Sequence, residues 1–387
     1  MVSFQQFKGV DNNLEIDING QRFTGFTYAS VQRSMDALCG TFFFSTTIKE
    51  DADGLIDNGL KMDDKVEIFI DDQKVMTGYI EELTIDAGVN NHELSFGGRD
   101  ITSDIIDSSM PEFSYNNSKN FKNLIEGVLK EAGINIKVIN NLTSQDLDTL
   151  NFNAFEGDGK AANLDSTIFD FFDHFAKQKQ VLLLTNENGD LVITREETNI
   201  SPGSLTCNKN DNNNNIISAS VNINTYERFS KVNISAQDSN AVNKNLINQE
   251  GFATDSQIRK SKQQRIFYPN KTTDPNALQN MSQWHVNMYK AKGTRYSTVT
   301  QGYYAQPVSE ILWEINTLVD VEDDLTKVKG QYLIEGFSFT KDVDSGSITR
   351  LNIVNKGSYS VKKEIEIEKE AGVNKSILEE LFKKAGI

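Results

Sequence analysis

Hydrophobic and polar residues alternate through most of the first hundred positions. Residues 14–18 place an apolar side chain at every second position, and Asn19-Gly20 follows them as a hairpin turn. Further strands are predicted where β-branched and aromatic residues gather, at 23–31, 40–48, 66–70, 75–85 and 92–96. Short strands joined by close turns are typical of a small barrel or sandwich.

The periodicity changes after residue 100. Segments 118–132 and 164–177 carry their apolar residues at helical spacing, with Ser118 as a candidate N-cap and Gly133 just past the first helix. Segments 181–185 and 191–194 then read as the two strands of a hairpin. Residues 100–200 are therefore expected to form a separate α/β unit.

Period-two segments return after residue 216. Strands are predicted at 219–223, 229–236, 264–268, 296–299, 311–315, 318–321, 332–339 and 348–354. They are interrupted by a long polar stretch, 237–262, and by a helix that opens at Asp274-Pro275 and ends at Gly293. The Asn-rich segment 208–215 predicts a loop.

Two segments far apart in the chain resemble each other. Residues 66–72 and 78–85 form a strand, an Asp-Asp turn and a strand with Ile80-Glu81; residues 318–324 and 331–339 repeat this order, with Ile334-Glu335. The shared dipeptides favour duplication of one β module over a chance likeness of two hairpins. A trimer of such a chain presents six similar modules in a ring, which is how a threefold object can sit on a sixfold one.

The fold class expected is α+β, β-rich and multidomain, with two related small β-barrels, an α/β insertion and a helical insertion. The predicted division is a first barrel at 1–99, an α/β domain at 100–200, a second barrel at 201–236 and 294–360, an insertion with a helix at 237–293, and a helical tail at 361–387.

Composition narrows the classes of function. Among 387 residues, 55 are Asp or Glu and 39 are Lys or Arg, giving a formal charge of −16. Such a chain lacks the basic footprint of a duplex-binding protein or of one that binds anionic membranes, although an acidic wall can let DNA pass without sticking. Two cysteines far apart make no disulfide framework, and no signal peptide or membrane span is expected.

Motifs for catalysis and for metal binding are mostly missing from the sequence. Residues 157–160 lack the first glycine and the Ser or Thr of a phosphate-binding loop, and residues 51–54 fail the spacing of a calcium loop. His92, His174 and His285 are not near one another or near a cysteine, so they form no zinc pair, and His285 is expected in a core or an interface. No enzyme, metal or cofactor is predicted, although 55 acids leave a glycosidase-like carboxylate pair open.

The most distinctive segment joins the first β module to the α/β unit. Gly97 and Gly98 are expected to end a strand, a short helix follows, and Arg99 is placed to pair with Asp104 or Asp107. We interpret these five residues as an interdomain hinge.

The tail carries a short amphipathic helix. Its apolar face consists of Ile377, Leu378, Leu381 and Phe382. Because so short a helix is marginal alone, it is expected to dock on its own chain or on a partner.

In sum, an ordered series of features resembles the baseplate hub proteins of contractile-tailed phages, of the phage Mu tail type. The matching segments are the strand pair 66–80 with Thr77-Gly78-Tyr79-Ile80, Gly98-Arg99-Asp100 leading to 104–109, the Asn188-Gly189 hairpin with 191–194, the helix of Trp284, and Leu312-Trp313 before 316–319. The order agrees across about residues 10 to 358, whereas the Asn-rich loop and the tail after Tyr359 depart from it.

This resemblance implies a structural protein of the virion: a homotrimeric ring with two tube-like barrels per chain, joining the sixfold tail tube to the threefold central spike. The implied partners are itself, the tail tube protein or a tube-terminating ring, the spike and other baseplate proteins, with DNA only passing through the lumen during genome ejection. Assembly is expected in the host cytoplasm, with no membrane insertion. Alternatives are a hub or spike component of a related secretion system or pyocin-like particle, and a tail-associated cell-wall hydrolase.

Overall fold

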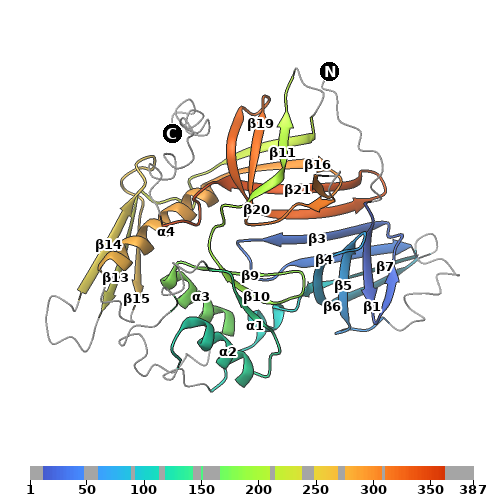
Figure 1. The fold of residues 1–387 in the computed structure, drawn as a ribbon, viewed down its shortest axis with the longest axis horizontal. Helices are drawn as coiled ribbons and strands as arrows, with labels where there is room; N and C mark the ends of the chain where they lie inside the picture. Colours follow the sequence, from blue (N-terminus) through green and yellow to red (C-terminus); the bar gives the residue numbers. More distant parts are fainter. Residues whose placement is uncertain are drawn as a thin grey trace.

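The computed structural model describes residues 12–47, 60–88, 92–112, 118–142, 150, 166–209, 214–237, 248–268, 275–306 and 310–361. Within these ranges the chain is mostly strand, with few helices (Figure 1).

The first β module is an antiparallel set of seven strands. They are β1 (Leu14–Ile18), β2 (Gln21–Phe23), β3 (Tyr28–Ser34), β4 (Thr41–Thr47), β5 (Lys65–Ile70), β6 (Gln73–Ala87) and β7 (His92–Asp100), in the spatial order β3-β4-β7-β6-β5-β1-β2. Asn19 and Gly20 adopt φ of 55° and 85°, the left-handed pair that a tight hairpin turn requires. The alternation read from residues 14–18 is confirmed, because Leu14, Ile16 and Ile18 are the buried positions of β1.

An α/β unit follows. It contains α1 (Ser103–Asp107), α2 (Phe121–Glu131), β8 (Val138–Asn140), α3 (Ile168–Lys179), β9 (Leu182–Thr185) and β10 (Leu191–Thr194), with the sheet order β8-β10-β9. The N-cap of α2 is Asn120, whose side chain accepts from the Asn123 N–H, and not Ser118 as expected. Gly133 follows α2 with φ of 73°, as its position after the helix predicted.

The second β module comprises β11 (Ile200–Cys207), β12 (Ile216–Ile223), β16 (Thr294–Gln301), β17 (Tyr304–Gln306), β18 (Ile311–Leu312), β19 (Leu318–Asp323), β20 (Val328–Asp342) and β21 (Gly346–Asn355). Its main path is β12-β16-β21-β20, and β19 pairs with both β20 and β11. β17 and β18 form a separate two-stranded sheet.

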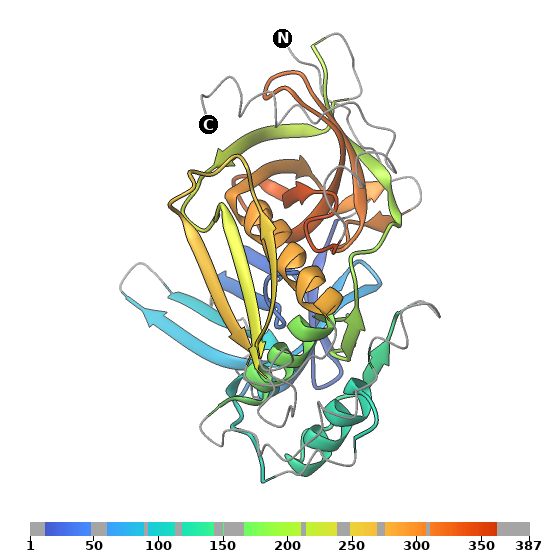
Figure 2. The same ribbon diagram turned by 90° about the vertical axis from the view of Figure 1, so that its left-hand side faces the viewer.

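An insertion interrupts the second module between β12 and β16. It holds β13 (Lys231–Gln237), β14 (Asn248–Thr254), β15 (Gln263–Tyr268) and α4 (Pro275–Gly293). Figure 2 shows α4 lying against the three strands, and Val232 and Ile234 pack there with Leu278 and Met281. β14 lies within the polar stretch 237–262 and was not predicted, because its sequence lacks a run of alternating apolar residues.

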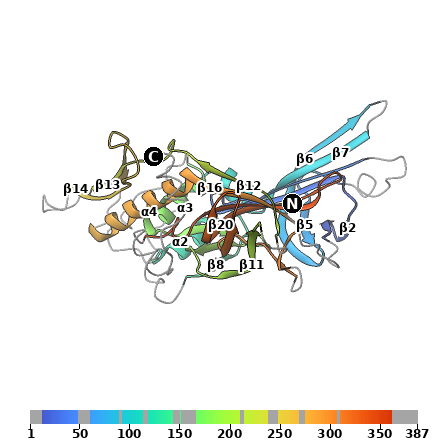
Figure 3. The same ribbon diagram turned by 90° about the horizontal axis from the view of Figure 1, so that it is seen from above.

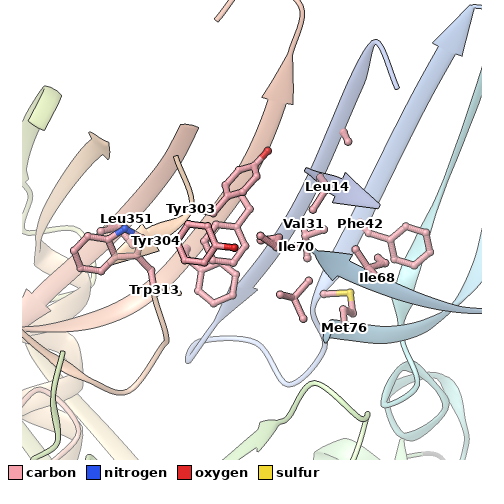
Figure 4. Packing of buried hydrophobic residues seen from close by; sticks show 14 of the residues in the cluster. Leu14, Val31, Phe42, Ile68, Ile70, Met76, Tyr303, Tyr304, Trp313 and Leu351 are labelled. Carbon is pink, nitrogen blue, oxygen red and sulfur yellow. The ribbon is translucent and has the colours of Figure 1, made fainter. Parts of the chain in front are cut away.

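The two modules do not form separate closed barrels in the described part of the chain. β20 pairs with β3, so that strands of both modules join in one open sheet of 13 strands. The hydrophobic core is also shared: Leu14, Val31 and Ile68 belong to the same cluster as Trp313 and Leu351 (Figure 4). The expected pair of small barrels is therefore replaced by one continuous sheet over a common core.

The predicted repeat is present in the structure. β5, β6 and β7 pair in the same way as β19, β20 and β21, and β6 and β20 are both 15 residues long. Each long strand has a register shift at the repeated Ile-Glu, at Glu81 and at Glu335. The strand pairings extend the equivalence to β4 with β16 and to β3 with β12, so that Ala29-Ser30-Val31 of one copy corresponds to the identical Ala219-Ser220-Val221 of the other.

Candidate assembly interface

The segment interpreted as a hinge continues as strand. β7 runs through Gly97 and Gly98 to Asp100 and is paired on both sides, with β4 and with β6. A Cβ at Gly98 would lie 1.9 Å from the Tyr79 carbonyl oxygen and 2.9 Å from Phe42 Cζ, so this position has no room for a side chain. The glycines permit close packing inside the sheet and do not end the strand as expected; a hinge role for the segment remains a proposal.

Arg99 joins the sheet to α1. Its Nε donates to Glu81 Oε2 at 2.6 Å, and its Nη1 donates to Asp107 Oδ1 at 3.1 Å. Of the two acids considered as partners from the sequence, Asp107 is the one bonded to Arg99, and these hydrogen bonds raise the pKa of the guanidinium. The Asp104 side chain is exposed, and partial desolvation of its carboxyl, followed by the nearby charges of Glu81 and Asp107, raises its pKa.

The turn after β7 depends on Asp100, which sequence reasoning did not single out. Its buried carboxylate accepts from the Gly40 N–H at 2.6 Å and from the Thr102 N–H at 2.9 Å. A carboxylate that satisfies two backbone donors fixes the exit of the chain from the sheet. The sequence did contain a signal for this role, because Asp100 directly follows Gly97-Gly98-Arg99 at the end of the strand.

Glu81 and Glu335 occupy equivalent bulges, and the surroundings of Glu335 show what such a bulge contacts when a second module lies beside it. The Met35 N–H, just past β3, donates to the Glu335 carbonyl at 2.8 Å. The Tyr359 hydroxyl lies 2.9 Å from both Asp36 Oδ1 and Glu335 Oε1. We call this group of Met35, Asp36, Glu335 and Tyr359 the internal corner.

The strand edges that pair between β3 and β20 have counterparts in the other copy of each module, on β12 and β6, and these edges are open among the described strands. β20 uses its first half for β19 and its second half, Gly336–Asp342, for β3. In β6, the first half pairs with β5, and the second half, residues 82–87, has β7 as its one neighbour among the strands that the structure describes. β12, the counterpart of β3, is an end strand of the sheet.

An exposed apolar side chain marks the open edge of β6. Ile85 on β6 is 53 % exposed, whereas its counterpart Phe339 on β20, covered by β3, is 1 % exposed. The β6–β7 hairpin projects from one end of the molecule, and β13 and β14 lie at the other (Figure 3). The two open strand edges therefore belong to β12 and β6, the counterparts of the strands β3 and β20 that pair at the internal junction.

A cavity of about 670 Å³ lies where β9–β10, the loop before β19 and the end of β3 meet. Its lining includes Arg33, Glu187, Glu197 and Glu314. Burial, Glu187 and Glu197 raise the pKa of Glu314, while Arg33 opposes them. A carboxyl group whose pKa is raised by burial and by neighbouring acids is the type of acid that glycosidases use, so the hydrolase alternative has its physical support at this cavity.

Other expected features have a simple outcome. Among the described residues, no group of three or more His, Cys, Asp and Glu is arranged to hold a metal ion. The helices that the structure describes include none long and apolar enough to cross a membrane. Ile377, Leu378, Leu381 and Phe382 of the predicted docking helix lie outside the described residues.

Comparisons with known proteins agree with the resemblance stated from the sequence. Residues 13–100 match the family model for the N-terminal part of the Mu phage baseplate assembly protein GpP-like. The chain is 21% identical over 373 residues to the baseplate hub protein gp44 of Escherichia phage Mu, covering 94% of this chain and 93% of that protein.

Two solved structures share the fold. The 43 kDa tail protein of prophage MuSo2 from Shewanella oneidensis has a TM-score of 0.73 at 23% identity, covering 90% of this chain and 100% of that one. A tail protein from Neisseria meningitidis MC58 has a TM-score of 0.72 at 17% identity, covering 90% and 97%. The resemblance to Mu-type baseplate hub proteins is confirmed.

Proposed function

We propose that this chain is a structural baseplate hub of a contractile phage tail, and that three copies form a closed ring through the open edges of β12 and β6. The observation that carries the proposal is the internal junction of β3 with β20, because the chain contains a second copy of each pairing edge, and both copies are open in the described part of the chain. An exposed strand edge is a template for pairing with another chain, and ring closure removes it.

The internal junction fixes the register of the proposed seam. Phe339 pairs with Val31, and their counterparts are Ile85 and Val221. The seam therefore sets Val221 of one protomer opposite Ile85 of the next, and Ile223 opposite Leu83. Val221 is half-buried and Ile85 is exposed in the single chain, so the contact covers apolar surface that the monomer leaves in water.

Three copies give six β modules in one ring. Six modules match the sixfold tail tube on one side, and the threefold order matches a central spike on the other. The ring is proposed to bind the tube protein or a tube-terminating ring, the spike and neighbouring baseplate proteins, first in the host cytoplasm and then in the virion. The net charge of −16 suits a lumen that DNA traverses without being held.

The seam is tested by light scattering on purified protein. The wild type is expected to have the mass of a trimer, and Val221→Lys, which puts an unpaired charge opposite Ile85, is expected to give monomers with an unchanged circular dichroism spectrum. Adding Ile85→Glu is expected to restore the trimer, because opposite charges directly across a strand pair attract. Leu325→Arg, at an exposed apolar site in the β19–β20 turn and away from the proposed seam, serves as the control and should leave the trimer intact.

A wild-type chain that stays monomeric at high concentration contradicts the ring, and a Val221→Lys variant that remains a trimer contradicts the seam. The second candidate function, a wall hydrolase, has the raised pKa of Glu314 in its favour. Zymography on bacterial cell walls tests it, and a cleared zone that is lost on Glu314→Gln would support it over a purely structural role.

A further inference from the structure

We propose that Tyr226 and the basic insertion behind it dock on an acidic corner of the neighbouring protomer, formed by Glu81, Glu82, Asp104 and Asp107 around the guanidinium of Arg99. This inference rests on the proposed ring and goes beyond it, because it assigns a partner surface to the insertion between β12 and β16. The occupant is a second copy of this chain.

The internal corner shows which groups of one module contact the bulge of the module beside it. The chain leaving β3 turns at Met35 and Asp36, donates a backbone hydrogen bond to Glu335 and brings the Asp36 carboxylate to the Tyr359 hydroxyl. Tyr359 is 3 % exposed, and Arg295 Nε lies 3.1 Å from Glu335 Oε2. The corner thus combines a tyrosine hydroxyl with carboxylates from two modules.

This corner has a counterpart in the first module. Glu81 takes the place of Glu335 at the bulge. Asp100 takes the place of Asn355, because Asp100 pairs with Gly78 and Asn355 pairs with Tyr332, each at the same distance from its bulge. Asp104 follows Asp100 by four residues, as Tyr359 follows Asn355. The sequence position that holds the tyrosine of the internal corner is therefore taken by a carboxylate, which is exposed and lies near Glu81.

The chain that leaves β12 corresponds to the chain that leaves β3. Asn224 is the counterpart of Ser34, so Thr225 and Tyr226 correspond to Met35 and Asp36. Tyr226 is 85 % exposed, and the Lys262 ammonium holds its loop by donating to the Thr225 and Tyr226 carbonyls. At the internal corner the chain leaving β3 supplies the acid, Asp36, and the other module supplies the tyrosine. In the proposed contact the chain leaving β12 supplies the tyrosine, Tyr226, and the neighbouring protomer supplies the acid, Asp104. A hydroxyl still pairs with a carboxylate.

Charge supports the same partner. Residues 224–293 contain ten Lys and Arg and five Asp and Glu, a net charge of +5 in a chain of −16. Residues 100–200, which include Asp104 and Asp107, contain 17 acids and eight bases, a net charge of −9. Opposite charges on the two surfaces favour this docking.

The pair is tested by cross-linking the full chain with a short bis-maleimide. Tyr226→Cys with Asp104→Cys is expected to give covalent dimers and trimers on a denaturing gel, while either single variant gives none. The native Cys39 and Cys207 are buried, at 8 % and 4 % exposure, and should stay unmodified. Tyr226→Cys with Asp344→Cys, an exposed acid in the β20–β21 turn, is the negative control and should remain monomeric on the gel.

A second pair separates this inference from the ring itself. Val221→Cys with Ile85→Cys reports the seam. Cross-linking of the seam pair without cross-linking of Tyr226→Cys to Asp104→Cys overturns the docking of the insertion and leaves the ring standing. Failure of both pairs, together with a monomeric mass, overturns the ring and this inference with it.

Discussion

At the scale of single residues, His285 shows how burial sets protonation. It lies on α4 at 7 % exposure, with its ring centroid 5.3 Å from that of Trp284 and 5.9 Å from that of Tyr289. Burial, and then the nearby charge of Lys177, lowers its pKa to about 4. The imidazole is therefore neutral at pH 7, as suits the core or interface position that its helical spacing predicted.

This shift makes stability depend on pH. The folded pKa of His285 lies below its ordinary 6.5, so its contribution is complete above pH 6.5 and is lost as pH falls toward 4. We expect His285→Asn to lose less unfolding free energy than the wild type between pH 7 and pH 4.5, by about 2–3 kcal/mol. Urea unfolding at both pH values measures this; equal losses in both proteins would refute it, and His92→Asn, at an exposed site, should behave as the wild type.

A buried ion pair illustrates what could not be read from the sequence. Arg228 and Asp255, 1 % and 2 % exposed, pair at 2.7 Å at the root of the insertion, and Arg228 also donates to Gln257. In the sequence both charges lie in or beside polar stretches that look solvated. A run of polar residues does not indicate which of its side chains will pair, so neither this ion pair nor the internal corner was predictable from the sequence.

At the scale of elements, the strands with strict alternation were predictable and their pairing was not. Residues 66–70, 75–85 and 348–354 are strands in the structure, because each has one face on the core. The join of β3 to β20, 300 residues apart, depends on which edges meet after the modules fold, and no local pattern encodes that. For the same reason two barrels were expected where one sheet is found.

The centre of β7 gives a prediction at this scale. We expect Gly98→Ala to cost about 3 kcal/mol or more, because its Cβ would meet the Tyr79 carbonyl at 1.9 Å and backbone cannot give way inside a paired sheet. Gly20→Ala, in a turn with φ of 85° and open space, is the matched comparison and should cost about 1–2 kcal/mol. Chemical denaturation compares them, and similar losses at both sites would show that β7 can relax.

At the scale of the whole molecule, duplication within one chain changes what each open edge means. One junction between modules is closed inside the chain, by β3 and β20, and among the described strands the same two kinds of edge lie open on β12 and β6. A chain with one open edge of each kind builds head-to-tail contacts, which close into a ring or continue as a filament. The angle between modules would determine whether the proposed ring closes at three copies, and the mass measurement tests this.

The tail supplies the last prediction. Its predicted apolar face is proposed to dock on a neighbouring tail protein, so Leu381→Asp with Phe382→Asp should leave the ring intact and lower the amount of hub incorporated into particles. Light scattering measures the first, and immunoblots of purified tails the second. Lys383→Asp with Lys384→Asp changes charge more but keeps the apolar side chains, and should incorporate normally if apolar burial drives docking. Normal incorporation of the Leu381→Asp, Phe382→Asp variant would mean that the tail is not a docking element, and loss of the ring itself would place the helix at the seam between protomers.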